Sequence, residues 1–104
     1  MAWVVLVVSG LFETVWAAAL DASNGFRRPV PVIVFAVALV ISMGGLGVAM
    51  QSIPIGTGYA VWVGIGAVGT AIYGMVAAGD AVTAARIGCL VLIVAGVVGL
   101  KVLH

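Results

Sequence analysis

The stretch AWVVLVVSGLFETVWAAAL, residues 2–20, decides the fold, because it is a continuous apolar run whose one charged residue is Glu13. A helix of about 20 apolar residues crosses the ~30 Å hydrocarbon layer of a bilayer. The run therefore predicts a membrane-spanning helix that holds Glu13 near the bilayer midplane. A charge at that depth costs roughly 3 kcal/mol on insertion scales, so Glu13 is a candidate functional residue.

The composition excludes a soluble domain. The chain has 104 residues, of which 65% are hydrophobic and 7% charged, whereas soluble domains carry about a quarter charged residues. The mean hydropathy is +1.42. We therefore expect residues 1–104 to form one membrane domain, with no room for a soluble catalytic domain. The net charge of +1 provides no basic surface for nucleic acid.

Three further apolar runs follow the first. The four expected helices cover residues 2–20, 30–50, 57–78 and 84–103. These runs do not alternate apolar and polar residues, as the strands of a membrane barrel would. The connections are short, so successive helices should be antiparallel neighbours. The predicted fold is an all-α integral membrane protein with four transmembrane helices.

The positive charges bear on orientation and on whether the first helix is kept. Arg27, Arg28 and Arg86 lie on one predicted side of the membrane and Lys101 on the other. This weak bias is compatible with insertion in both orientations. No Lys or Arg precedes the first run and Glu13 interrupts it, so we expect it to be retained rather than cleaved as a signal peptide.

Helical spacing predicts what surrounds the acid. Ser9, Gly10, Trp16 and Ala17 are three or four positions from Glu13 and share its face. One acid, one large aromatic donor and small residues indicate a cavity that contains a carboxylate. The alternative is a neutral glutamic acid that joins helices by hydrogen bonds, although Gln would serve that purpose without a charge.

The second and third helices supply further candidates. Tyr59 and Trp62 are three positions apart and could form two walls of a cation site, since aromatic faces attract cations. The alternative is an aromatic belt at the membrane interface. Ser42 could donate to a carboxylate in the bundle, but a Ser in a membrane helix often bonds its own backbone instead.

The segment GIGAVG, residues 64–69, matches the glycine pattern of dinucleotide-binding loops. That fingerprint needs a preceding strand and a helix that opens at the glycines, whereas this copy lies inside an apolar span. We interpret Gly64 and Gly66 as the bend of a flexible third helix. The sequence contains no metal-ligand cluster and no nucleophile-base pair, so we predict no cofactor, no metal and no enzymatic activity.

Small residues recur along the last helix, which predicts close packing against another helix. The candidates for an oligomer contact are Gly88, Ala95, Gly96 and Gly99. The alternative is accidental spacing, because glycine is common in membrane helices.

A lone carboxylate in hydrocarbon can be neutralised by a proton or by a bound cation. If only the neutral complexes reorient cheaply, Glu13 exchanges cations for protons across the membrane. Alternating access usually requires two inverted halves around a midplane site. Two copies of this chain inserted in opposite orientations would supply those halves.

With these features the chain resembles the small multidrug resistance family, and more narrowly its guanidinium-exporter subtype. The resemblance covers nearly the whole chain and rests on its length, its four spans and shared motifs in the first, third and fourth helices and in two connections. The motifs are Glu13 in the first helix, NGF at residues 24–26, PIG at 54–56, YAVW at 59–62, GIG at 64–66 and LIVAGV at 92–97. The subtype is indicated by Trp16, where drug-exporting relatives tend to have a small residue.

The resemblance implies a multi-pass protein of the cell (inner) membrane that forms an antiparallel, dual-topology homodimer. Glu13 of both subunits would bind substrate or protons, and the last helix would carry the dimer contact. The residues implied to line the site are Gly10, Trp16, Ser42, Tyr59 and Trp62. The sequence GDAV at residues 79–82 departs from the family pattern, which more typically has Glu-Pro in this loop.

Guanidinium suits these residues, because it is planar, charged at neutral pH and able to give a carboxylate two parallel hydrogen bonds. Two alternatives keep the same family: a polyspecific exporter of quaternary ammonium or lipophilic cations, and one half of an obligate heterodimer. A proton-carrying rotor subunit fits four spans poorly. A non-transporting membrane scaffold is the remaining alternative.

Overall fold

The computed structural model describes residues 1–103, and over this range the chain forms four helices and no strand. They are α1 (Ala2–Ala22), α2 (Pro29–Ala49), α3 (Ile55–Ala77) and α4 (Ala84–Leu103). Each is long and apolar enough to cross a membrane. The predicted all-α membrane fold with four spans is confirmed.

The helix ends differ from the expected ranges by up to two residues, for local reasons. α1 runs on to Ala22 because Ser23, rather than the charged Asp21, terminates it. The Ser23 hydroxyl donates to the Leu20 carbonyl at 2.7 Å and accepts the Phe26 amide at 3.1 Å. Such hydrogen bonds satisfy groups that a helix end leaves open.

Two of the other differences, at the starts of α2 and α3, follow from proline. α2 begins at Pro29, one residue early, because proline suits the first turn of a helix, where its missing N–H is not needed. α3 begins at Ile55, two residues early, directly after Pro54. The Gly58 amide already donates to the Pro54 carbonyl at 2.8 Å.

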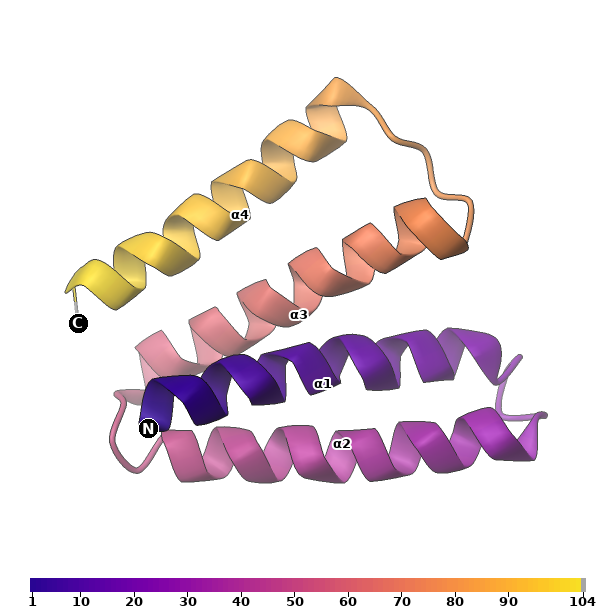
Figure 1. The fold of residues 1–104 in the computed structure, drawn as a ribbon, viewed down its shortest axis with the longest axis horizontal. Coiled ribbons are helices and arrows are strands. Elements are labelled where there is room, and N and C mark those ends of the chain that lie inside the picture. The colour runs from indigo at the N-terminus through magenta and orange to yellow at the C-terminus, as the bar shows by residue number, and fades with distance from the viewer. Residues whose placement is uncertain (104) are drawn as a thin grey trace.

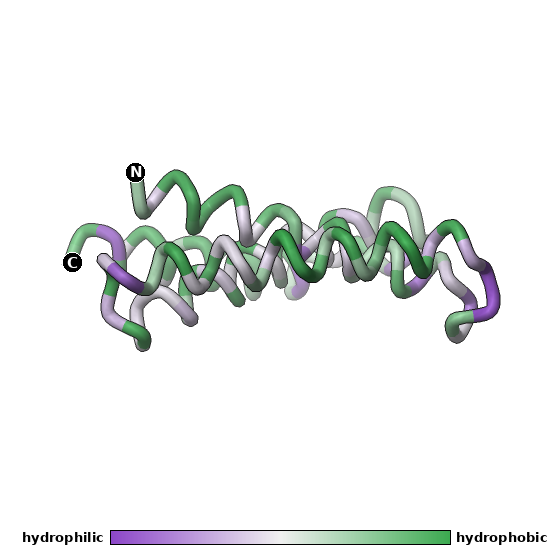
Figure 2. Tube along the Cα trace, turned by 90° about the horizontal axis from the view of Figure 1, so that it is seen from below, coloured by the Kyte–Doolittle hydropathy of each residue, from purple (hydrophilic) through white to green (hydrophobic). Residues whose placement is uncertain are grey.

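The helices form a flat arrangement in which α1 is central. α1 packs against α2 and α3, whereas the backbone of α4 approaches that of α3 alone, and α4 leans away from the other three (Figure 1). The chain measures 41 × 34 × 17 Å, and 17 Å is less than two helix diameters. Seen edge-on, apolar helices run between polar segments at the two ends (Figure 2).

The buried core lies between α1, α2 and α3. It consists of Leu6, Leu46, Ala49, Ile53, Val61 and Trp62. Two buried hydrogen bonds cross the same region. The Trp62 indole donates to the Ser42 hydroxyl at 3.1 Å, and this hydroxyl donates to the Ser9 carbonyl at 2.7 Å. Because the bilayer core offers no water to replace such bonds, these two bonds hold the three helices together.

We expect Ser42→Ala to lower the free energy of unfolding by about 1 kcal/mol, the size of an interhelical hydrogen bond in a membrane protein. The indole N–H of Trp62 would then lack its acceptor. The measurement is reversible unfolding in mixed detergent micelles, with Ser52→Ala as the control because Ser52 is exposed. Equal stability of the two variants would contradict the assigned role of Ser42.

Candidate functional site

Glu13 lies on a cavity of about 450 Å³ between α1 and α3. The lining side chains come from one face of each helix and from the loop after α3. They are Glu13, Trp16, Ala17, Val63, Gly66, Ala67, Thr70, Ala71 and Asp80. The cavity therefore connects a carboxylate in the middle of one span with a second carboxylate in a loop.

Two polar atoms at this cavity have no hydrogen-bond partner among the described residues. They are Oε1 of Glu13 and Nε1 of Trp16, and both atoms are buried. A buried polar group without a partner costs about 1–3 kcal/mol. A carboxylate oxygen accepts and an indole N–H donates, so the site offers one atom of each kind to a ligand, a proton or water.

The position of the Glu13 carboxyl depends on Gly66 of α3. A Cβ atom placed on Gly66 would overlap the carboxyl group of Glu13, and one on Gly69 would overlap the Thr14 hydroxyl. The Thr14 hydroxyl donates to the Gly66 carbonyl at 3.4 Å. The two glycines thus let α1 approach α3 and leave a space for the acid.

Trp16 is held in place by α2, a contact that the sequence did not predict. The ring of Phe35 meets that of Trp16 edge-on, with centroids 6.0 Å apart and an interplanar angle of 77°. Phe26 packs on Phe35 in the same way, at 5.8 Å and 72°. Edge-to-face aromatic contacts of this kind favour one ring orientation, so the Trp16 ring is fixed as a wall of the cavity.

Two other predicted lining residues, Ser42 and Trp62, lie in the α1–α2–α3 core, and a third, Tyr59, lies beside it. Ser42 and Trp62 are buried and bonded to each other, and the Ser42 hydroxyl donates to the Ser9 backbone rather than to Glu13. Tyr59 is 54% exposed, and its ring lies 5.8 Å from that of Trp62, tilted by 36°. A substrate role for these three residues stays a prediction.

The structure also shows where Gly10, Gly64 and Gly66 lie, and their predicted roles stay predictions. Gly10 faces Ile65 of α3, where a Cβ would lie 2.9 Å from the Ile65 side chain, and a Cβ on Gly64 would meet Val97 of α4 at 2.6 Å. α3 is one continuous helix through Gly64 and Gly66. In this structure these glycines allow close approach between helices, and the predicted bend of α3 stays a prediction.

The small-residue face of α4 is open. Cβ atoms placed on Gly88, Gly96 and Gly99 would meet nothing within 4 Å, and no residue of α4, Ala95 included, is buried. This face is therefore available for another helix, and its use as a dimer contact stays a prediction.

Two groups of lining residues are absent from the residues that the sequence predicts for the site. Val63, Ala67 and Thr70 repeat at intervals of three and four beside Gly66, so the face of α3 that meets Glu13 was readable from spacing. Asp80 was noted only as part of an unusual loop, and nothing in the linear sequence indicates that this loop returns to the cavity.

The contact between Glu13 and Gly66 predicts that Gly66→Ala destabilises the wild type but stabilises a variant that lacks the Glu13 carboxyl. Gly66→Ala should lower the free energy of unfolding by about 1–3 kcal/mol, since the methyl group overpacks the site. In a Glu13→Ala background the same change should raise it by up to about 1 kcal/mol, the usual gain from Gly to Ala in a helix. Unfolding in mixed micelles measures both.

Gly44→Ala is the matched control, because Gly44 lies in α2 with open space around it. This variant should be stabilising in both backgrounds. If Gly66→Ala were equally harmful with and without the Glu13 carboxyl, the assigned contact would be wrong.

Comparison with known proteins agrees with this architecture. A family model described as Small Multidrug Resistance protein matches residues 1–93. A protein of Yersinia pseudotuberculosis named guanidinium exporter is 54% identical over 101 residues, which cover 97% of each chain. Guanidinium exporters of Escherichia coli K12 and Salmonella typhimurium are 48% and 50% identical over 97% of this chain and 96% of their own length. With its four spans, the chain is a multi-pass protein of the inner membrane, and it belongs to the small multidrug resistance family.

Proposed function

We propose that this protein is a proton-coupled antiporter that exports guanidinium and small guanidinyl cations, with Glu13 binding either substrate or proton. The observation that carries the proposal is the unpartnered Glu13 oxygen on a cavity inside a membrane span. The relatives named guanidinium exporters, which align over nearly their whole length, support this substrate.

The chemistry of the cavity suits a guanidinium ion. A carboxylate can accept two parallel N–H bonds from the planar ion, while the ion's face stacks on an aromatic ring. Glu13 supplies the carboxylate, and Trp16, with its ring fixed by Phe35, supplies the wall. The Trp16 N–H can donate to the same carboxylate and orient it. Binding and release involve no covalent chemistry, so the proposal requires neither an enzymatic step nor a cofactor.

Coupling follows from the cost of moving a bare charge through hydrocarbon. An ionised, empty Glu13 is costly to reorient, whereas Glu13 with a proton or with a cation is neutral. If only the two neutral complexes change their exposure, each cation that leaves is replaced by protons that enter.

We further propose that the working unit is an antiparallel homodimer with two Glu13 residues. The flat monomer and the open small-residue face of α4 support a second copy. Inverted copies provide the two halves that alternating access requires around a midplane site. A heterodimer with a second family member is the alternative assembly.

The first experiment imposes a guanidinium gradient on proteoliposomes and follows internal pH. We expect guanidinium to drive proton movement in the wild type and in Asp21→Asn, an exposed acid away from the cavity, but not in Glu13→Gln. Proton flux driven by tetraphenylphosphonium but not by guanidinium would favour the polyspecific exporter, which the family description also fits.

A second prediction concerns the Trp16 N–H. Trp16→Phe keeps an aromatic wall and removes the donor, so the KM for guanidinium should rise about ten- to hundredfold, the value of one hydrogen bond to a charged group. Trp3→Phe, at the opposite end of α1's apolar run, should leave the KM unchanged. An unaltered KM in Trp16→Phe would remove Trp16 from the binding site.

A further inference from the structure

The Glu13 cavity has a second carboxylate, Asp80, in the loop between α3 and α4. This loop lies on the side of the membrane at which α1 also ends (Figure 1). The cavity thus runs from the acid in the middle of α1 to an acid at the membrane surface. A cation that moves along this cavity between Glu13 and the water on this side passes Asp80.

The backbone fixes Asp80 in this position. Gly79 has φ of +79°, a left-handed conformation that favours glycine, and it turns the chain back over the end of α3. The Asp80 amide then donates to the Gly74 carbonyl at 2.9 Å. A Cβ on Gly74 would overlap the Asp80 carboxylate, so the acid occupies the space that this glycine leaves free.

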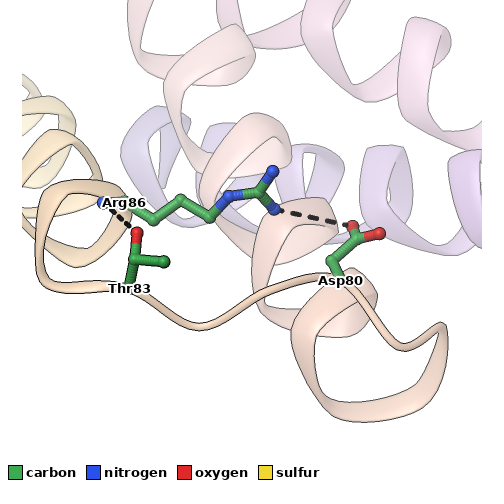
Figure 3. A network of polar contacts seen from close by, with 3 residues as sticks. All are labelled: Asp80, Thr83 and Arg86. Carbon is green, nitrogen blue, oxygen red and sulfur yellow. Dashed lines mark hydrogen bonds and ion pairs between the residues drawn. The ribbon is translucent and has the colours of Figure 1, made fainter.

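Asp80 already holds a guanidinium group, that of Arg86. Nη1 of Arg86 lies 4.0 Å from Oδ2 of Asp80, and both side chains are about half exposed, at 52% and 53%. The Arg86 amide donates to the Thr83 hydroxyl at 3.1 Å, which anchors the arginine in the first turn of α4. Figure 3 shows the three residues, with the guanidinium directed at the carboxylate.

We propose that Asp80 is an outer binding station for the exported cation, and that Arg86 is a resident guanidinium that occupies this station when no cargo is present. The inference rests on the proposed guanidinium export. It adds a specificity-determining residue at the membrane surface to the acid at the midplane.

The geometry makes the exchange of one guanidinium for the other inexpensive. Arg86 reaches one carboxylate oxygen through one nitrogen, at the outer limit for an ion pair, and exposed pairs of this kind are weak. A free guanidinium ion is not tethered and can give the carboxylate two parallel hydrogen bonds. It can therefore displace Arg86, while the returning Arg86 helps to release it.

The test measures the KM for guanidinium-driven proton flux in proteoliposomes at low ionic strength. Asp80→Asn should raise the KM about three- to fivefold, the value of one exposed charge contact, without changing the maximal rate or the protons moved per cation. Asp21→Asn is the matched control, since it removes the same charge from an exposed position near the same membrane face. It should leave the KM at the wild-type value.

Two further variants separate an exchange on Asp80 from a general effect of charge. Arg86→Gln should lower the KM in the wild-type background and have no effect in the Asp80→Asn background. Gly74→Ala displaces the carboxylate without altering the net charge, and it should raise the KM as Asp80→Asn does.

The inference is overturned if Asp80→Asn has the same KM as Asp21→Asn, or if Arg86→Gln changes the KM equally in both backgrounds. It is also overturned if Asp80→Asn lowers the melting temperature and the maximal rate at constant KM, because the ion pair would then be a structural tie. If guanidinium drives no proton flux in the wild type, the proposed function itself fails and the outer station fails with it. If the wild type transports normally, a negative result with the variants counts against the role of Asp80 and leaves the proposed function intact.

Discussion

The structure depends on one constraint: a carboxyl group placed in the middle of a membrane span must have room and a controlled environment. Gly66 meets this constraint, because any side chain at that position would overlap the Glu13 carboxyl. The close approach of α1 and α3 follows from it, as does the adjoining cavity. A buried carboxylate oxygen without a partner is costly in hydrocarbon, so Glu13 favours a proton or a cation that neutralises it.

A small number of contacts between helices supports this arrangement. Ser42 and Trp62 tie α2 and α3 to α1 by hydrogen bonds that water cannot replace. On the other side of the acid, Phe35 of α2 orients Trp16. α4 has no buried residue, and its backbone approaches that of α3 alone. Its Val97 and Leu100 pack at the edge of the core, and its Lys101 lies over the ring of Trp3 in α1. Because only α1, α3 and one loop line the Glu13 cavity, a second copy of the chain could complete it, as the proposed dimer requires.

The sequence was sufficient for the features that depend on length and hydropathy: the four spans, and the position of Glu13 near the middle of the first. It was insufficient where the outcome depends on how each helix is rotated about its axis. Spacing placed Tyr59 and Trp62 on one face, but it could not show that Trp62 would bond to Ser42 instead of facing Glu13. Phe35 carries no polar group to attract notice. Asp80 reaches the cavity because Gly79 turns the chain back, and that conformation is not encoded in any periodic pattern.

The two carboxylates of the cavity occupy contrasting environments, and this contrast assigns them different roles in the proposed pathway. Glu13 is partly buried and has one buried oxygen without a partner, so it gains most from a cation. Asp80 is half exposed and already paired, so it gains little and exchanges readily. Because the exposed Asp80 binds weakly and the more buried Glu13 binds more strongly, a cation that moves from one to the other can lose its water in steps. In the proposed cycle Arg86 neutralises Asp80 between transport events, so that the outer acid does not become a second trap for the cation that Glu13 has just released.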